Sequence, residues 1–272
     1  MSFRRDAPKP IERIYAVGDI HGRFDLFGQL MRMVERDQAL RLPVPTMIIL
    51  LGDLVDRGPE SARIVHGCME LTASTRRFMV LKGNHEEMMV EALRGDLTVY
   101  GHWLGFGGRE TLLSWGVEPA IAEGPGTIEN LRAAAAVVGT EVIDWLARLP
   151  LSYRHDGYFF VHAGIRPGVP LRKQTDDDML WITDEFLDSK AWHGATVVHG
   201  HSINEGGPAI YPNRIGIDTG AYRTGRLTAV GVERGETWML NTAPVEESTS
   251  AADGYMIKAA TARDAYDLGR SI

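Results

Sequence analysis

Five short segments of the chain place a side chain that can bind a metal ion directly after an apolar run. They are GDIHGR, GDLVDRG, GNHE, VHAGIRP and HGHS, which begin at Gly18, Gly52, Gly83, Val161 and His199. Their Asp, Asn and His side chains supply the carboxylate, amide and imidazole ligands that divalent metal ions bind. Two such ions close together supply a nucleophile near neutral pH and positive charge for phosphoryl oxygens, so these residues predict hydrolysis of a phosphoester.

The candidate ligands follow predicted strands, at the point where each strand ends. Strands are expected at 14–17, 47–51, 78–81, 158–161 and 196–198, and they lead to Asp19, Asp53, Asn84, His162 and His201. Open α/β sheets bind their ligands beyond the carboxyl ends of the strands. The sequence therefore predicts a site at that edge of the sheet structure.

Helical patterns separate the first three strands, which is typical of an α/β fold. Apolar residues recur close to a 3.6-residue period over 25–40, and Pro59 precedes a second expected helix at 61–71. From about 93 to 150 this alternation breaks, and we expect a helical insertion over the site. Later runs at 214–217, 227–232 and 237–240 indicate an antiparallel meander. We expect one domain over 1–243 and a C-terminal tail over 244–272.

The composition of the chain limits the classes of binding partner that it fits. The 272 residues are 44% hydrophobic, which is enough for a substantial core. The net charge of -7 and a pI near 5.7 argue against a nucleic-acid or anionic-membrane partner, because either would require a basic face. Cys68 is the single cysteine and can form no intrachain disulfide. No apolar stretch has the length of a membrane span, and the basic N-terminal residues are not followed by the apolar core of a signal peptide. These features predict a cytoplasmic protein.

The order GDxHG, GDxxDRG, GNHE, HAG and GH[TS] resembles the phosphoprotein phosphatase family of the calcineurin-like metallophosphoesterase superfamily. The similarity is greatest to its bacterial serine/threonine phosphatase branch, to which the symmetrical diadenosine tetraphosphate hydrolases are related. It runs from Ile14 to about Gly231, and five ordered blocks with compatible spacing are far more specific than GDxHG alone. The resemblance implies a four-layer α/β fold with a central mixed β-sandwich flanked by helices. It also implies two divalent metal ions, with manganese expected and iron or zinc as alternatives.

The resemblance also implies a role for each matching residue. The expected metal ligands are Asp19 and His21 for the first ion, Asp53 for both ions, and Asn84, His162 and His201 for the second. A carboxylate is suited to bridging because its two oxygens carry several lone pairs, whereas a neutral imidazole has one free acceptor nitrogen. His85 is the expected general acid, with Asp56 orienting it, and Arg57 and Asn84 are the expected contacts to the substrate phosphate.

The expected activity is hydrolysis of phosphomonoesters, above all phosphoserine and phosphothreonine of proteins, by direct attack of metal-bound hydroxide. The substrate is thus a phosphorylated protein or a small phosphoester. Symmetrical dinucleoside polyphosphate hydrolysis is an alternative that the shape of the insertion would decide. A phosphate-binding regulatory module with little turnover is a second alternative, and the retention of His85, Asp56 and the metal ligands argues against it.

One segment departs from the pattern. In relatives the stretch written LWITDEF here, at 180–186, usually reads LWIR, and that Arg contributes to phosphate binding, whereas this chain has Thr183. Arg109, Arg166 or Arg223 is a candidate to compensate. His199 lies two residues before His201, but only His201 matches the ligand position of the family, so His199 is not among the predicted metal ligands. The histidines that match no metal block are expected to be surface or structural residues; they are His66, His102, His155 and His193.

Overall fold

Buried strands at the start and end of the chain build the first sheet. The computed structural model describes residues 11–242. In it β1 (Arg13–Val17), β2 (Thr46–Leu50) and β3 (Phe78–Val80) are parallel, and α1 (Phe24–Leu40) and α2 (Ser61–Ser74) connect them. β9 (Thr228–Glu233) and β10 (Glu236–Asn241) add an antiparallel hairpin, so the order is β10-β9-β1-β2-β3.

The middle of the chain forms a second mixed sheet with the order β4-β5-β6-β8-β7. Its central strands β5 (Tyr158–Val161), β6 (Thr196–His199) and β8 (Arg214–Gly216) are parallel. The edge strands β4 (Ser152–His155) and β7 (Ala209–Ile210) are antiparallel to their neighbours. The parallel strands of both sheets therefore end toward the same side of the molecule, where their loops carry the predicted ligands.

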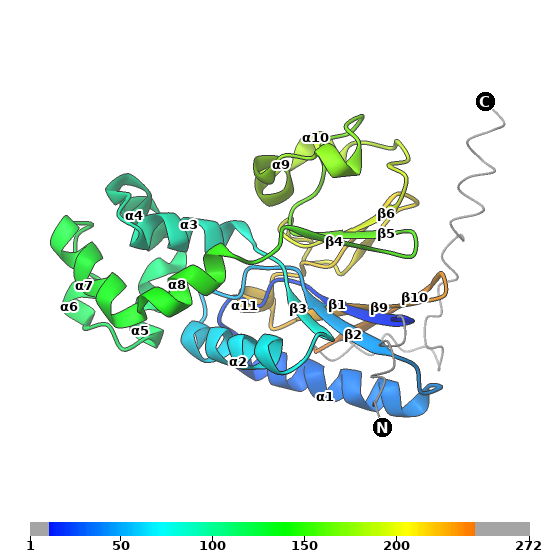
Figure 1. Cartoon of the computed structure of the whole chain (residues 1–272), viewed down its shortest axis with the longest axis horizontal. Helices are drawn as coiled ribbons and strands as arrows, with labels where there is room; N and C mark the ends of the chain where they lie inside the picture. Colours follow the sequence, from blue (N-terminus) through cyan, green and yellow to red (C-terminus); the bar gives the residue numbers. More distant parts are fainter. Residues whose placement is uncertain (1–10, 243–272) are drawn as a thin grey trace, which may run out of the picture.

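Four layers result from packing the two sheets face to face (Figure 1). Apolar side chains such as Ile49 and Phe160 fill the space between the sheets. Helices α1 and α2 cover the first sheet through residues that include Leu30 and Val65. On the outer face of the second sheet lie α9 (Asp176–Trp181) and α10 (Asp184–Leu187), and Phe186 of α10 shares a buried apolar cluster with Val197 of β6. This arrangement confirms the predicted four-layer α/β fold.

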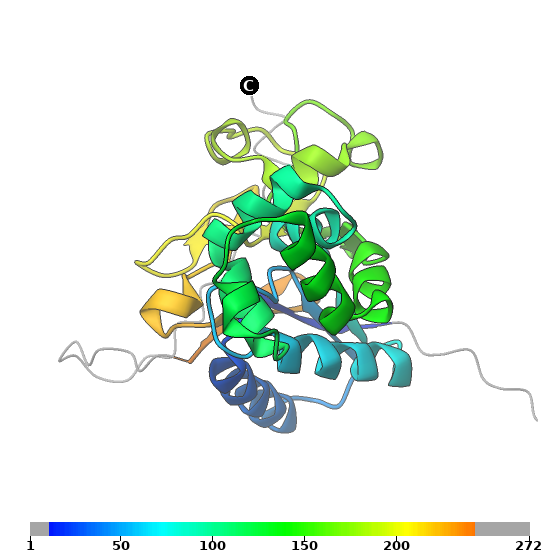
Figure 2. The ribbon, with the colours of Figure 1, turned by 90° about the vertical axis from the view of Figure 1, so that its left-hand side faces the viewer.

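A group of helices between β3 and β4 stands at one end of the sheets (Figure 2). It comprises α3 (Asn84–Leu93), α4 (Leu97–Trp103), a π-helical turn η1 (Leu104–Gly108), α5 (Arg109–Ser114), α6 (Pro119–Ala122), α7 (Ile128–Val138) and α8 (Thr140–Ala147). We call the part from α4 to α8 the insertion helices. The remaining helical turns are η2 (Leu171–Lys173) and α11 (Ala221–Thr224). The proposed division into one domain and a tail stays a prediction, and residues 244–272 lie outside the described range.

The predicted strands all occur, each within one residue of its expected ends. The predicted meander is wrong in its pairing, because β8 joins β6 and β7 in the second sheet, whereas β9 and β10 complete the first. Two edge strands, β4 and β7, had no apolar run to indicate them. No helix within 11–242 has the length and apolar character needed to cross a membrane.

Candidate metal and phosphate site

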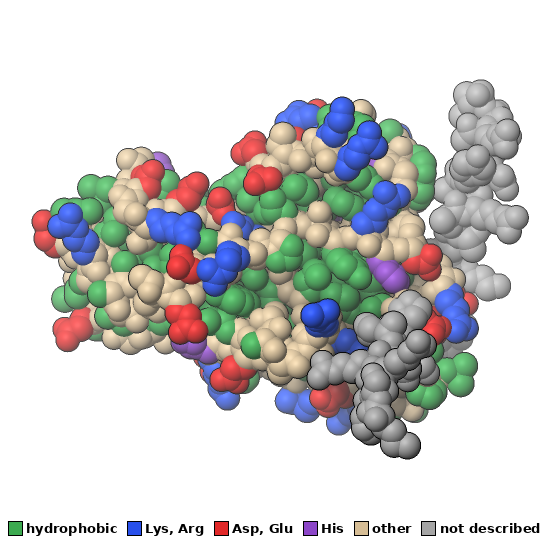
Figure 3. Space-filling model, in the orientation of Figure 1, with side chains coloured by type: hydrophobic (Ala, Val, Ile, Leu, Met, Phe, Trp, Pro, Cys, Tyr) green, Lys and Arg blue, Asp and Glu red, His purple; other side chains and the backbone are tan. Residues whose placement is uncertain are grey.

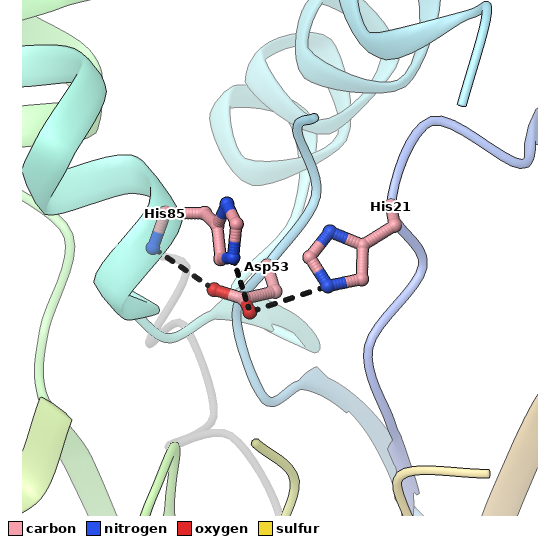
Figure 4. A group of neighbouring side chains, drawn as sticks. All are labelled: His21, Asp53 and His85. Carbon is pink, nitrogen blue, oxygen red and sulfur yellow. Dashed lines mark hydrogen bonds and ion pairs between the residues drawn. The ribbon is translucent and has the colours of Figure 1, made fainter. Parts of the chain in front are cut away.

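The predicted side chains meet around the carboxylate of Asp53, which follows β2. His21 Nε2 lies 3.5 Å from Asp53 Oδ2, and His162 Nε2 lies 3.4 Å from Asp53 Oδ1. His85 approaches from the start of α3, with Nε2 3.9 Å from Oδ2 and its backbone N–H donating to Oδ1 at 3.1 Å (Figure 4). Loops from both sheets thus contribute to one buried cluster.

The other predicted ligands surround the same point. Asn84 Oδ1 lies 2.7 Å from His162 Nε2 and 3.1 Å from His201 Nδ1. The Asp19 carboxylate accepts the backbone N–H of His201 at 3.0 Å. All six residues expected to bind metal are therefore brought together, although their division between two ions stays a prediction.

Unusual backbone conformations hold these side chains in place. Five site residues have φ in the left-handed region, namely His21 (44°), Asp53 (50°), Asp56 (74°), Arg57 (70°) and His201 (59°). Such conformations are uncommon for residues other than glycine and are maintained only where the surroundings enforce them. Their concentration at one site is typical of a functional centre.

Glu86 is the buried group that fixes the loop after β2. Its carboxylate accepts the backbone N–H groups of Asp53, Leu54 and Gly83, each at 2.8 Å. A side chain at Gly83 would collide with the Asp53 carboxylate, so glycine is required for this close approach. Glu86 therefore orients Asp53 from behind, and burial raises the pKa of Glu86 to about 7.

The imidazole rings are arranged as ligands. His21 Nδ1 lies 2.8 Å from the Val55 carbonyl oxygen and His162 Nδ1 lies 2.9 Å from that of Leu51, so each Nδ1 carries the proton and donates it. The lone pair of each Nε2 then faces the centre of the site. Backbone carbonyls orient metal-binding histidines in this way in many proteins. Burial also lowers the pKa of His21 and of His201 to about 3, and lowers that of His162, which favours the neutral rings that bind metal.

The carboxylates complete a donor set that suits divalent cations. Burial, together with the nearby Asp218 and Asp53, raises the pKa of Asp19. For Asp53 burial acts in the same direction, but the surrounding imidazoles, His162 first, outweigh it and the pKa is lowered. Two groups of side chains could each hold a metal ion, because the potential ligand atoms within each group lie within 4.8 Å of one another. One group is His21, Asp53 and His85, and the other is Asp19, Asp53 and His162. Asp53 belongs to both groups, as a bridging ligand would.

His85 and Asp56 form a hydrogen-bonded pair beside this centre. His85 Nδ1 donates to Asp56 Oδ2 at 2.6 Å, which turns Nε2 toward the cavity. Asp56 is itself held by Thr111 Oγ1 at 2.7 Å and by Trp103 Nε1 at 3.0 Å, both from the insertion helices. Burial lowers the pKa of His85, but the carboxylates of Asp53 and Asp56 outweigh it and the net shift is upward.

Arg57 lies next to the two histidines that face the cavity. Its guanidinium nitrogens are 3.0 Å from His21 Nε2 and 3.1 Å from His85 Nε2, and its Cζ lies 4.6 Å from the centre of the Tyr222 ring. Of the Lys and Arg residues within 11–242, Arg57 alone lines the cavity at this site. It is the cation available to a phosphate oxygen there.

The cavity has a volume of about 490 Å³ and extends from the metal ligands to a mostly apolar wall. The wall residues are Met88, Glu91, Val99, His102, Phe106, Trp181 and Ile203. Sequence reasoning missed these residues, and His102, expected to be a surface or structural histidine, lines the cavity. For His102 and Phe106 the only signal was a Gly-rich and Trp-rich composition near residues 100–115, which does not reveal which side chains face the site.

None of the three arginines suggested as replacements for the missing Arg lines the cavity. Arg109 donates to the carbonyl oxygens of Ala122 and Gly124. Arg166 pairs with Asp178 and Glu185, and Arg223 pairs with Glu205. Thr183, at the start of α10, is exposed and does not line the cavity either.

Comparison with known proteins agrees with this geometry. A family model described as Calcineurin-like phosphoesterase matches residues 12–225. The chain is 26% identical over 242 residues to Serine/threonine-protein phosphatase 1 of Salmonella typhimurium, covering 85% of this chain and 97% of that protein. It is 29% identical over 163 residues to the symmetrical Bis(5'-nucleosyl)-tetraphosphatase of Nitrosococcus oceani, covering 57% of this chain but only 44% of that protein.

Among solved structures, the cold-active protein-tyrosine phosphatase of a psychrophilic Shewanella species superposes with a TM-score of 0.54 at 17% identity. The match covers 85% of this chain and 78% of that one, and it indicates a shared fold. The family match covers most of the chain, and the candidate metal-binding side chains of the matching motifs meet at one site. The chain therefore belongs to the calcineurin-like phosphoesterase family.

Proposed function

We propose that this protein is a metal-dependent phosphatase that hydrolyses phosphomonoesters, with phosphoserine and phosphothreonine of proteins as preferred substrates. The observation that carries the proposal is the Asp53 carboxylate, which lies within 3.4–3.9 Å of three imidazole nitrogens. Asp19, His21, Asp53, Asn84, His162 and His201 would hold two divalent ions, manganese first among the candidates. Bound there, the ions would supply an activated nucleophile and positive charge for the phosphoryl oxygens.

The residues around the ions then have distinct tasks. Arg57 presents two nitrogens toward the cavity and binds a phosphoryl oxygen, for which its planar fork of donors is suited. His85 Nε2 delivers a proton to the leaving oxygen, since Nδ1 is occupied by Asp56. Asp56 holds the ring in that orientation and is fixed by Thr111 and Trp103.

The extent of similarity favours a protein phosphatase over a symmetrical tetraphosphatase. The match to the Salmonella phosphatase covers 85% of this chain and 97% of that protein, whereas the match to the symmetrical tetraphosphatase leaves more than half of that enzyme uncovered. The asymmetrical Bis(5'-nucleosyl)-tetraphosphatase of Bacillus mycoides matches 81% of this chain and 91% of its own length, which supports a dinucleotide substrate. A dinucleoside polyphosphate is the second candidate substrate. The exposed rings of Phe106 and Trp181 on the cavity wall favour it, because such rings stack on a nucleobase.

The two candidates are distinguished by comparing substrates on one manganese-loaded preparation. We expect kcat/KM to be higher for a phosphoserine peptide than for diadenosine tetraphosphate, with an aryl phosphate as a reference substrate. The Asp53→Asn variant, assayed in parallel, identifies any contaminating phosphatase. A clear preference for diadenosine tetraphosphate would replace the first assignment by the second, and no turnover of any of the three would reject both.

A further inference from the structure

A second cavity, of about 660 Å³, lies on the other side of the segment that carries His201. It sits on the outer face of the second sheet, between the end of α10 and strands β7 and β8. Figure 1 shows α10 above this sheet. Ile203 lines both cavities, but the metal ligands do not line this one. The second cavity is therefore separate from the proposed catalytic site.

Arg214 supplies a buried positive charge in this cavity. The residue is only 7% exposed, and no ion pair within 11–242 includes it. Its guanidinium instead lies over aromatic rings, with Cζ 3.9 Å from the centre of Tyr211 and 5.9 Å from that of Phe186. A buried charge is costly unless it is paired, so this arrangement calls for an anion.

Two further polar atoms at the cavity lack a protein partner. Within the described chain, His199 Nε2 and Ser202 Oγ are buried and form no hydrogen bond. His199 is 2% exposed, and its Nδ1 lies 3.1 Å from the Gly200 carbonyl oxygen, to which it donates. Its Nε2 therefore offers a lone pair. A side chain at Gly216 would lie 3.1 Å from that nitrogen, so glycine avoids a close contact with the ring there.

The arrangement of these groups is fixed by the sheet. His199 pairs with Gly216 in the β6–β8 register, so His199 and Arg214 lie on the same face. The rim of the cavity includes Lys190, whose segment is tied to β8 by Asn213 Nδ2 through the carbonyl oxygens of Ser189 (2.8 Å) and Ala191 (3.0 Å). Asp188 also lines the cavity and offsets part of the positive charge.

We propose that this cavity is a second anion site, which binds inorganic phosphate or a phosphate monoester independently of the metal centre. Arg214 and Lys190 bind the anionic oxygens, and a protonated oxygen or hydroxyl of the ligand donates to His199 Nε2. Ser202 Oγ completes the contacts. Because a donor is required, hydrogen phosphate fits the site better than sulfate, which carries no proton at neutral pH.

Isothermal titration of inorganic phosphate into the metal-loaded enzyme tests this site. We expect two phosphates per chain for the wild type. Arg214→Met should abolish binding of one of these phosphates or lower its affinity at least about tenfold, because charge-assisted hydrogen bonds are lost. The competitive inhibition constant of phosphate, which reports the metal site, should not change. Arg154→Met, an exposed arginine on β4 of the same sheet, is the matched control and should keep both phosphates.

Variants at the rim test the site without altering the buried residues. Lys190→Ala should lower the affinity for the second phosphate. Asp188→Asn should raise this affinity, because a negative charge beside the anion is removed. A single phosphate per wild-type chain would overturn the proposal, as would a second phosphate that is unaffected by Arg214→Met. Equal affinity of the second site for sulfate would contradict the role given to His199. These titrations do not depend on turnover, so failure of the proposed function would leave them interpretable.

Discussion

At the scale of single residues, Asp53 has the most demanding role, because it alone belongs to both groups of potential ligand atoms. We expect Asp53→Asn to abolish phosphatase activity and to reduce the bound metal below two ions per chain, since an amide offers one oxygen and no charge. Metal analysis after gel filtration, beside an activity assay, measures both effects. Asp144→Asn, at an exposed ion pair with Arg94, is the control. Two retained ions with normal turnover in Asp53→Asn would refute the bridging role.

The role of His85 as general acid is tested by measuring how the loss of kcat in His85→Asn depends on the leaving group of the substrate. If His85 protonates the departing oxygen, His85→Asn should lower kcat for a phosphoserine substrate by about 10²- to 10⁴-fold. The leaving group of an aryl phosphate is a weaker base and needs less protonation, so the loss of kcat should be smaller for that substrate. Asp56→Asn should show the same trend, because Asp56 holds His85 at 2.6 Å. Equal losses along a series of leaving groups would exclude the acid role.

The sequence indicated most of these chemical groups but not the residues that hold them. Asp53, Asn84 and His162 stand out because each follows an apolar strand within a short motif. Thr111 and Trp103 bind Asp56 from a part of the chain that is distant in sequence, and nothing in their neighbourhood suggests that contact. Such partners depend on how the insertion helices pack.

At the scale of elements, α9 is anchored to the loop after β5 by Arg166. Arg166 pairs with Asp178 in the first turn of α9, and this hydrogen-bonded pair holds the pKa of Asp178 below its ordinary value. A depressed pKa stabilises the fold at pH values above the unfolded pKa, about 3.9, and the contribution disappears as the pH falls through the lower, folded pKa. Arg166 is thus a structural residue and not a replacement for the missing phosphate-binding Arg.

We therefore expect Arg166→Met to be less stable than the wild type at pH 7, and the difference to shrink below about pH 4. The effect should be modest because the arginine is partly exposed. Urea unfolding at several pH values measures it, with the exposed Arg132→Met as a control. Phosphate inhibition should be unchanged in Arg166→Met. A constant stability difference down to pH 2 would show that Asp178 is not the group involved.

Strand positions were predictable to within a residue because buried strands read as apolar runs bounded by glycine or polar residues. Sheet membership was not predictable. Ile215 in β8 and Val230 in β9 both face the core between the sheets, so their sequences look alike although their strands belong to different sheets. Similarly, the helical insertion expected over about 93–150 was not divided into separate helices, although α7 and α8 are separated at Gly139, where φ is 86°.

At the scale of the whole molecule, the cavity is assembled from distant segments. Figure 3 shows acidic and basic side chains interspersed on the face in view. The cavity wall combines Phe106 from the insertion with Trp181 at the end of α9, whose ring centre lies 6.5 Å from that of His201. This pairing of segments about 75 residues apart depends on tertiary packing, which motif spacing does not encode.

Substrate preference should therefore depend on these two rings. Phe106 is 56% exposed and Trp181 is 41% exposed, so both have surface free to contact a substrate. An aromatic contact contributes about 0.5–1.5 kcal/mol beyond burial of area, so Phe106→Ala and Trp181→Ala should each raise KM for an aryl phosphate about two- to tenfold. KM for free phosphoserine, which has no ring, should change little, and kcat should fall less than KM rises because neither ring touches the proposed acid or Arg57. Trp192→Ala removes an equally exposed ring (40%) outside the cavity and is the matched control. An equal rise in KM for both substrates, or a similar effect of Trp192→Ala, would show that the rings do not contact the leaving group.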